Sequence, residues 1–352
     1  MYLLDTILVA ALALKGALAL PHVDVTTTSK KHKCPPFSGS FEIDYYQVYP
    51  ENADFDFDSC LFYISCVWNA TLMIYDPYKH KVLNILSFPG ISHTTTYHVS
   101  GVGVDQRTGL VSIVVDSWAA IVSGGSNLTG DNFLLQLDPA TRELVYKINL
   151  TETTQNKYSG FGDVEQDPKG NVYVVGGFPS SILKVDKYGE NVTPWYLPEP
   201  IIPTNAGLNG LAAHGWTLLA NDANSKILKF DMRDPVGTPV LVPHHPNMNW
   251  TFTDAIYLPR RYHGTVLLLA EDLVGIIVLR SRDGRWDSAE FLGKVLNTVP
   301  NSYTVAPAQI GESIYLIPTE VGDINKPNTG AGTQDKFPII DITAEVDALL
   351  AE

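Results

Sequence analysis

The chain has 352 residues, of which 45% are hydrophobic, and it contains 27 Gly and 23 Pro. This composition suits an all-β protein with many turns. The formal net charge is −14 at pH 7, and because binding of a phosphate backbone needs clustered Lys and Arg, it excludes nucleic acid as a partner.

The chain begins with an apolar segment typical of a secretory leader. Residues 1–19 are largely apolar, and Ala17-Leu18-Ala19 offers the small-x-small pattern that signal peptidase accepts. The run is short for a membrane span, and Lys15 interrupts it. We therefore expect residues 1–19 to be a cleaved signal peptide, followed by an N-terminal segment over 20–39. The mature protein would have no membrane span and would be secreted or held in the lumen of a secretory vesicle.

A unit of roughly fifty residues then recurs, a spacing typical of arrays and propellers. Its clearest copies are residues 167–175 with 182–186, and residues 218–222 with 227–231, in which short apolar strands flank turns and the last strand ends in Asp. No such unit could bury both of its faces without a neighbour on each side. The other strands that we predict are 60–67 and 71–76 in blade one; 101–105, 110–116 and 133–138 in blade two; 254–258, 265–270 and 275–279 in blade five; and 303–308, 313–318 and 338–342 in blade six.

Blade six leaves no room for a fourth strand before the chain ends, whereas the strand-like stretch 40–46 stands unassigned before blade one. An unpaired last blade would leave an open sheet edge. We therefore predict that residues 40–46 complete blade six. The predicted fold class is all-β, a six-bladed β-propeller over residues 40–343 whose ring is closed by an N-terminal strand. Residues 343–351 look helical, and 344–352 form a C-terminal tail.

Passage through the secretory pathway would allow the chain to form a disulfide and to be glycosylated. An oxidising compartment favours one disulfide among Cys34, Cys60 and Cys66. In the blade model Cys34 and Cys60 lie on the same side of the ring and Cys66 on the other, so we predict a Cys34–Cys60 disulfide and a buried free thiol at Cys66. Five Asn-x-Thr sequons favour a glycoprotein. Their acceptors are Asn69, Asn127, Asn149, Asn191 and Asn249.

Propellers bind ligands at one end of the central channel, where innermost strands begin and second strands end. The ends supply Trp68, Asp116, Trp118, Phe178, Asn221, Asp222, Glu271 and Glu320. The starts supply Glu51, His98, Asp163, Asn209, Asp254 and Tyr303. Large aromatics beside a few polar groups are the usual profile of a small-molecule site. The alternatives are packing between blades for each aromatic and a turn or strand-end cap for each acid.

Two resemblances refine this interpretation. Leu208-Asn209-Gly210-Leu211-Ala212, followed by residues 219–227, resembles the blade signature of six-bladed propellers related to gluconolactonase, senescence marker protein and strictosidine synthase. In the lactonases a Glu, an Asn and an Asp hold a divalent cation, usually Ca²⁺. Here Asn221 stands at the Asp position, Gly162 stands at the Asn position, and Glu51 is the candidate for the Glu. We therefore expect no metal and no other cofactor, and a Ca²⁺-dependent lactonase is an alternative.

The chain also resembles secreted propellers of fungal secondary-metabolite clusters in its leader, its Cys-containing segment and its blade pattern around Phe178 and Asn209. These include the trichothecene-cluster protein of unknown function and the hetero-Diels–Alderases of tropolone-sesquiterpenoid biosynthesis. The resemblance implies a pericyclase whose partners are apolar small molecules. A tropolone or phenol would lose water to give an ortho-quinone methide, which a humulene-type terpene alkene would trap.

Roles follow from this second resemblance. An acid or base would assist loss of water, and the candidates are Asp222, Asp254, Glu271 and His98. Hydrogen-bond donors would bind the heterodiene oxygen, and the candidates are Asn209, Asn221 and Tyr303. Aromatic side chains would shape the hydrocarbon site, and the candidates are Trp68, Trp118 and Phe178. A third alternative is a secreted small-molecule-binding propeller without catalysis.

Overall fold

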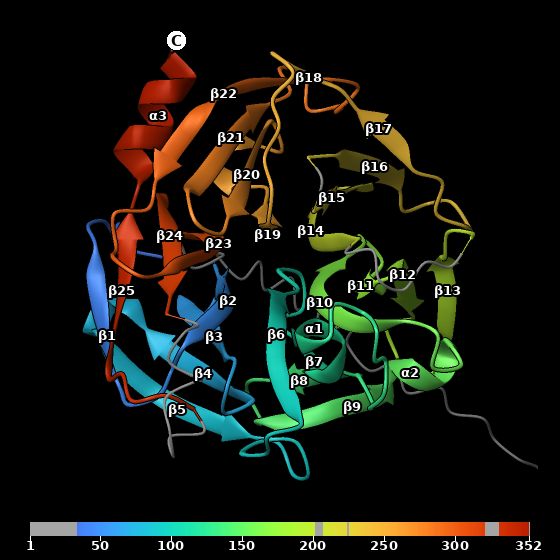
Figure 1. Cartoon of the computed structure of the whole chain (residues 1–352). Helices are drawn as coiled ribbons and strands as arrows, with labels where there is room; N and C mark the ends of the chain where they lie inside the picture. The colour runs from blue at the N-terminus through green and yellow to red at the C-terminus, as the bar shows by residue number, and fades with distance from the viewer. Residues whose placement is uncertain (1–33, 201–206, 224, 321–330, 352) are drawn as a thin grey trace, which may run out of the picture. The chain divides into compact units, whose positions relative to one another are not determined.

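The computed structural model describes residues 34–200, 207–223, 225–320 and 331–351. The predicted signal peptide and most of the N-terminal segment lie outside these residues. Within them, no helix is long and apolar enough to cross a membrane. The strands form six small sheets arranged in a ring (Figure 1), so the predicted six-bladed propeller is confirmed.

Blades one to three follow one another along the chain as four-stranded antiparallel sheets. Blade one contains β2 (Pro50–Asp56), β3 (Leu61–Cys66), β4 (Thr71–Asp76) and β5 (Lys81–Ser87). Blade two contains β6 (Tyr97–Val104), β7 (Val111–Ser117), β8 (Phe133–Asp138) and β9 (Glu143–Asn149). Blade three contains β10 (Ser159–Gln166), β11 (Val172–Phe178), β12 (Ser180–Val185) and β13 (Val192–Tyr196).

The other blades include one with an extra strand and one that joins the two ends of the chain. Blade four contains β14 (Leu208–His214), β15 (Thr217–Asp222), β16 (Ile227–Asp231) and β17 (Val240–Val242). Blade five contains β19 (Thr253–Tyr257), β20 (Val266–Glu271), β21 (Gly275–Arg280) and β22 (Ala289–Leu296), with β18 (His244–His245) parallel to β22. Blade six contains β23 (Tyr303–Ile310), β24 (Ser313–Thr319), β25 (Lys336–Asp341) and β1 (Phe41–Asp44).

The ring closes through β1, as predicted. This strand pairs antiparallel with β25, with Phe41 opposite Ile339. The first strand of each blade is innermost, and each innermost strand contacts the next around the ring, from β23 back to β2. Because every blade is covered on both faces, middle strands such as β4, β7 and β20 are buried along their whole length.

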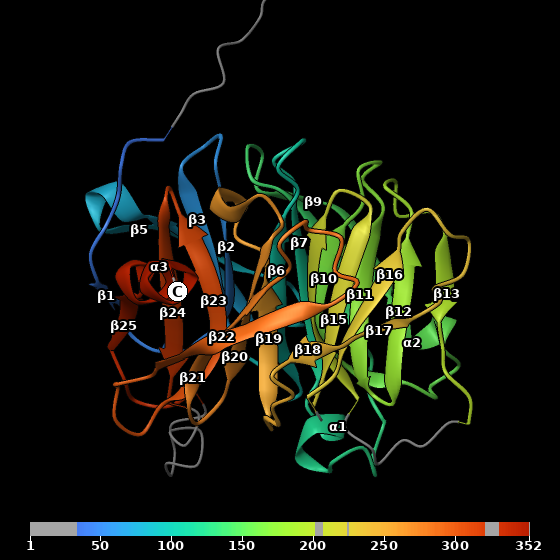
Figure 2. The same ribbon diagram turned by 90° about the horizontal axis from the view of Figure 1, so that it is seen from above.

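Short helices distinguish the two ends of the ring. The innermost strands begin at the end that carries α1 (Ala119–Val122) and α2 (Leu150–Thr153), which we call the α1 end (Figure 2). The opposite, η2 end carries η1 (Pro77–Lys79) and η2 (Arg260–Tyr262). The predicted C-terminal helix is confirmed as α3 (Thr343–Ala351). It contacts β22 and β24, and its Asp347 forms a 3.0 Å ion pair with Arg261.

Each innermost strand carries a bulge or register shift close to its start. The shifts occur at Pro50/Ala53, Val99/Val102, Phe161/Asp163, Leu208/Leu211, Thr253/Ile256 and Thr304/Ala306. A bulge leaves one residue unpaired and redirects neighbouring side chains, and bulges are frequent next to active sites. All six irregularities therefore lie at the α1 end of the ring.

The predicted disulfide is present between Cys34 and Cys60 at the η2 end. Cys66 is a free, buried thiol, as expected. Burial raises its pKa to about 12, so it is not ionised at neutral pH and makes a poor nucleophile.

The five predicted glycosylation acceptors all lie in turns or at strand ends. Asn127, Asn191 and Asn249 are exposed, whereas Asn69 and Asn149 are half-buried. Glycosylation itself stays a prediction.

Candidate active site

An aromatic group lies at the α1 end between blades one and two. His98, the second residue of β6, pairs across the sheet with Asp116 of β7. The His98 ring meets Trp118 edge-on with centroids 4.2 Å apart, and it meets Trp68 at 5.1 Å. The two indoles are themselves T-shaped at 5.3 Å. These edge-to-face contacts hold three rings beside one carboxyl group.

Polar atoms in this group lack partners among the described residues. They are Trp68 Nε1, His98 Nδ1 and Asp116 Oδ2, on side chains that are 5%, 4% and 1% exposed. In blade six, the hydroxyls of Thr304 and Thr319 are buried and equally without a partner. A buried polar atom without a hydrogen bond is costly and points to a functional role. The concentration of such atoms at one end makes it the candidate for a binding site.

Carboxyl groups from several blades meet near the axis. Glu51 is the second residue of the innermost strand β2, Asp254 lies on innermost β19, and Asp272 follows β20. Burial, together with repulsion from Glu51, Asp272 and Asp163, raises the pKa of Asp254 well above its usual range. Burial and the charge of Asp272 raise the pKa of Glu51 to about 7. Glu51 and Asp254 lie near the starts of innermost strands, so their carboxyl groups belong to the α1 end of the ring.

We call Glu51, Trp68, His98, Asp116, Trp118, Asp254 and Asp272 the axial cluster. Burial, and then the charge of Glu51, raise the pKa of Asp116 well above its usual range. Burial lowers the pKa of His98 to about 4, so the imidazole is neutral at pH 7. Among the described residues no Lys or Arg pairs with a carboxyl of this cluster. The cluster therefore holds protons near neutral pH that ordinary carboxyl groups would have lost.

A second set of polar side chains joins the innermost strands. Asn52 Nδ2 of blade one donates across the ring to Asp163 Oδ1 of blade three at 3.1 Å. Asp163 also accepts from Leu211 N of blade four at 2.9 Å, and Asp54 accepts from Val104 N of blade two at 2.8 Å. Innermost strands have one edge without a strand partner, so these carboxyl groups satisfy backbone donors there. Their role is structural.

The structure brings together several residues that the sequence singled out. Trp68 belongs to the hydrophobic cluster between blades six and one, and Trp118 and Tyr303 pack against that same cluster. Asp254 Oδ1 accepts from Asn209 Nδ2 at 3.1 Å, and this amide also donates to Thr253 O.

Four other candidates are engaged elsewhere. Asp222 caps the turn after β15, accepting from Lys226 N at 2.9 Å. Glu271 forms an ion pair with Lys294. Asn221 is fully buried; its oxygen accepts from Gly210 N and its nitrogen donates to Thr253 and Asp254. Phe178 ends β11 and packs against Gly160, where an added Cβ would lie 2.7 Å from the ring. These contacts are the capping and packing alternatives that the sequence left open.

Three acids in the cluster had no acid role in the sequence interpretation. Asp116 is among the strand-end candidates and Glu51 among the strand-start candidates, and the sequence offers Glu51 only as a metal ligand. Asp272 is not among the candidates, because the predicted strand 265–270 places Glu271 at its end. Successive residues of a strand point to opposite faces, so the adjacent pair Glu271-Asp272 was itself the signal that one carboxyl group could face the axis.

The residues present do not fit the cation site of the lactonases. Both polar atoms of Asn221 are bonded to the protein, and Gly162 supplies no side-chain ligand. No group of three or more His, Cys, Asp or Glu within the described part of the chain is arranged to hold a metal ion.

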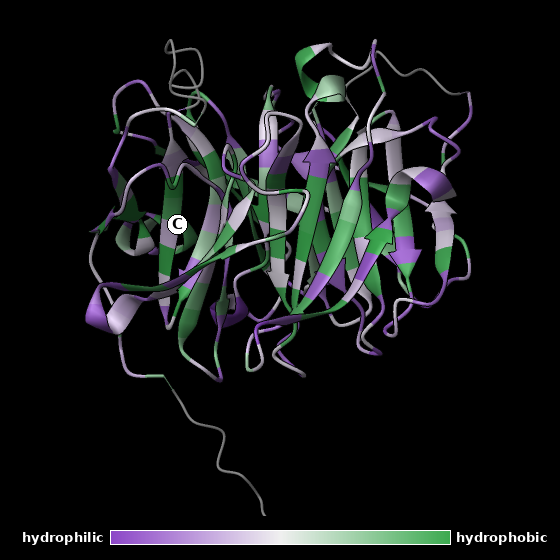
Figure 3. Cartoon of the chain, turned by 90° about the horizontal axis from the view of Figure 1, so that it is seen from below, coloured by the Kyte–Doolittle hydropathy of each residue, from purple (hydrophilic) through white to green (hydrophobic). Residues whose placement is uncertain are grey.

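Exposed apolar side chains occur at both ends of the ring, and at the η2 end they include Tyr188 and Val236, which are 64% and 62% exposed. Exposed apolar side chains at the α1 end include Val122, Phe252, Leu273 and Leu296, which are 65%, 70%, 70% and 64% exposed. Figure 3 colours α1 largely green and much of the opposite end purple. An apolar compound would therefore meet a compatible surface at the end that bears the axial cluster.

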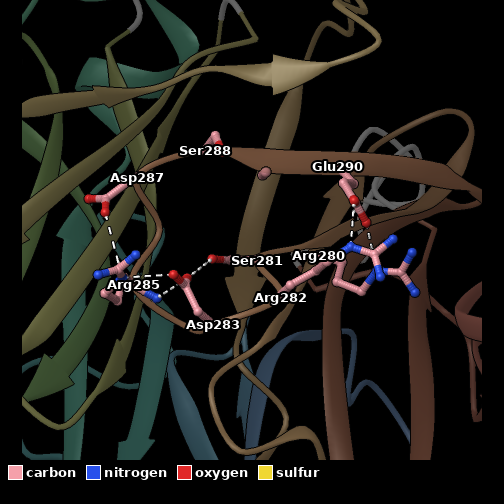
Figure 4. A pocket seen from close by; sticks show the side chains of 9 residues that line it. Arg280, Ser281, Arg282, Asp283, Arg285, Asp287, Ser288 and Glu290 are labelled. Atoms are coloured by element: carbon pink, nitrogen blue, oxygen red, sulfur yellow. Dashed lines mark hydrogen bonds and ion pairs between the residues drawn. The ribbon is translucent and has the colours of Figure 1, made fainter.

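The η2 end carries a shallow hollow of about 250 Å³ on blade five, which is lined by charged side chains (Figure 4). Its arginines already have acidic partners. Arg280 and Arg282 contact Glu290 at 2.8 and 2.7 Å, and Arg285 contacts Asp283 at 2.7 Å. This hollow is a charge-paired surface, and we do not assign the function to it.

Comparisons with known proteins agree with the fold and identify relatives. No family model matches the chain. It is 38% identical over 336 residues to trichothecene biosynthesis protein 14 of Trichoderma arundinaceum, covering 90% of this chain and 92% of that protein. It is 32% identical over 338 residues to core trichothecene cluster protein 14 of Fusarium sporotrichioides, covering 90% and 88%.

Solved structures share the fold at low identity. The major Malassezia sympodialis allergen Mala s 1 matches with a TM-score of 0.75 at 18% identity, covering 87% of this chain and 96% of the allergen. A gluconolactonase from Xanthomonas campestris matches with a TM-score of 0.54 at 12% identity, covering 86% and 89%. At these identities the likeness concerns the fold alone.

Proposed function

This chain belongs to the family of trichothecene cluster protein 14, and from that membership together with the axial cluster we propose that it is an enzyme of fungal secondary metabolism. The reaction that we propose is a hetero-Diels–Alder cycloaddition between a tropolone- or phenol-derived ortho-quinone methide and a humulene-type terpene alkene. The observation that carries the proposal is the set of buried, unpartnered polar atoms of Trp68, His98 and Asp116 beside carboxyls of raised pKa.

The first step needs an acid. A hydroxymethyl group on the aromatic ring accepts a proton, its C–O bond breaks, and the electron pair leaves with water. The ring hydroxyl loses its proton and becomes the carbonyl of the quinone methide, so the net change is loss of one water. Carboxyl groups that remain protonated near neutral pH support this step. Asp116 and Asp254 have this property, because burial and repulsion from Glu51 raise their pKa values well above the usual range.

The second step needs two apolar partners held in one orientation. A C–C and a C–O bond form as the alkene adds across the heterodiene, with no other reactant. Holding both partners together can contribute several kcal/mol, of the order seen for oriented intramolecular reactions. The edge-to-face rings of Trp68 and Trp118 offer an apolar wall, and Trp68 Nε1 supplies a donor for the carbonyl oxygen, where negative charge grows.

A binding protein without catalysis is the competing interpretation, since the same wall and donors would hold an apolar ligand. Incubation of the purified protein with apolar metabolite fractions of the producing organism, followed by mass spectrometry, separates the two. The proposal predicts a product whose mass is the sum of two components less one water, formed at a rate above that with heat-inactivated protein. Ligand retention without a new product would contradict it and favour a carrier. Activity lost to a chelator and restored by Ca²⁺ would contradict it in favour of a lactonase.

A further inference from the structure

Asp116 and Asp272 each have a buried carboxyl oxygen without a partner among the described residues, but the Asp272 side chain is only half-buried. Asp116 is the second-last residue of β7 and only 1% exposed, and its Oδ2 has no hydrogen-bond partner among the described residues. By contrast, Asp254 Oδ1 accepts from Asn209, and Asp163 accepts from three donors. A buried carboxyl oxygen without a partner is free to bind a ligand.

The groups that face Asp116 set its chemistry. His98 of β6 lies directly across the sheet, and its imidazole is neutral. Glu51 of β2 repels Asp116, while Asp254 of β19 and Asp272 beyond β20 surround Glu51 in turn. No described Lys or Arg pairs with any of these acids. Burial and the repulsion by Glu51 favour the protonated form of Asp116, whose side chain is the most buried of these carboxyl groups.

We infer that Asp116 is the catalytic acid of the axial cluster. The inference rests on the proposed function, because it names the donor for the dehydration. The Asp116 O–H proton passes to the hydroxymethyl oxygen, the C–O bond breaks, and water leaves. The Asp116 carboxylate then takes the proton from the ring hydroxyl as this becomes a carbonyl, so the acid is regenerated and the step balances.

The aromatic neighbours fit this role. Trp68 and Trp118 stand edge-on to the His98 ring, which pairs with Asp116, so a planar ring bound against the indoles lies within reach of the carboxyl group. Positive charge that develops as water leaves is stabilised by the aromatic faces. Asp222 and Glu271, which the sequence also offered as acids, are engaged by Lys226 and Lys294.

The test has an arm that needs no substrate. Difference infrared spectra of the whole protein at pH 7 should show the band of a protonated carboxyl group that is missing in Asp116→Asn and present in the exposed control Asp58→Asn. In Glu51→Gln this band should disappear at lower pH than in the native protein, because the repulsion that holds the proton is removed. If the Asp116→Asn spectrum matches that of the native protein at pH 7, the inference is overturned.

The second arm measures adduct formation. Asp116→Asn should lower the turnover rate by about 10²–10⁴-fold, the usual contribution of a general acid, with thermal melting unchanged or raised. Glu51→Gln should turn over at the native rate at low pH. As the pH rises, its rate should begin to fall at a lower pH than the rate of the native protein. If Asp254→Asn lost turnover rate to this extent while Asp116→Asn kept full activity, the catalytic acid would be Asp254 and the inference would be overturned. If no fraction reacts with the native protein, the proposed function fails, whereas the infrared arm still reports where the proton lies.

Discussion

Replacing Glu51 by Gln should stabilise the protein, and the gain should grow with pH. Burial and Asp272 raise the pKa of Glu51 from 4.5 to about 7. Well below pH 4.5 both the folded and the unfolded chain hold this proton, so the carboxyl group does not lower the free energy of unfolding. As the pH rises, the unfolded chain releases the proton while the folded chain retains it, so the free energy of unfolding falls until the folded group ionises near pH 7.

The size of the effect follows from the same two values. A difference of about 2.5 in pKa corresponds to about 3 kcal/mol at pH 8, where the cost is fully expressed, and to about 1 kcal/mol at pH 5. Gln has nearly the same shape and does not ionise, so Glu51→Gln removes this cost. It also relieves Asp116 and Asp254, whose pKa values Glu51 raises, which adds in the same direction.

Urea unfolding at pH 5, 6, 7 and 8, followed by tryptophan fluorescence, measures this difference. The exposed Glu143 offers a control, because Glu143→Gln should change stability by less than about 0.5 kcal/mol at every pH. A stability difference for Glu51→Gln that stays constant with pH, or that shrinks as pH rises, would refute the assignment of a proton to Glu51 in the folded state.

Three further substitutions test the scaffold. Replacing Cys34 and Cys60 by Ser opens a loop of 26 residues, and guanidinium unfolding should show a loss of about 3.5 kcal/mol; an unchanged midpoint would contradict a role in ring closure. Asn221→Ala leaves buried backbone groups without partners and should cost about 3 kcal/mol by the same assay, and a loss below about 0.5 kcal/mol would show that its bonds do not join blades four and five. Asp347→Ala removes the contacts to Arg261 and Tyr262; it should speed hydrogen exchange in α3 with little change in global stability, and unaltered exchange there would contradict the anchoring.

The fold could be predicted from the sequence because its signals are local and repeated. Middle strands of a blade are buried on both faces, so β4, β7 and β20 read as short continuous apolar runs. The missing fourth strand of blade six and the spare strand at the N-terminus each pointed to the same closure, which β1 and β25 confirm. The Cys34–Cys60 pairing followed from strand direction alone.

The candidate site could be predicted only in part. Position at a strand start or end was enough to select three aromatic candidates, and the structure brings them into one group: Trp68, His98 and Trp118. Asp116 and Asp222 occupy equivalent places near the ends of second strands, yet Asp116 lies unpaired beside Glu51 while Asp222 caps a turn with Lys226. Nothing in the local sequence separates these two outcomes.

The sequence by itself determined a closed ring of six blades and its Cys34–Cys60 disulfide, because apolar runs, turns and strand count can be read from neighbouring residues. Only the tertiary structure decided which acids lie together in the candidate site. Every innermost strand is bulged near its start, and a shift of one residue turns a side chain from one face of a strand to the other. The protons of Glu51, Asp116 and Asp254 in turn depend on charges brought from separate blades, since repulsion between carboxyl groups acts through space and not along the chain.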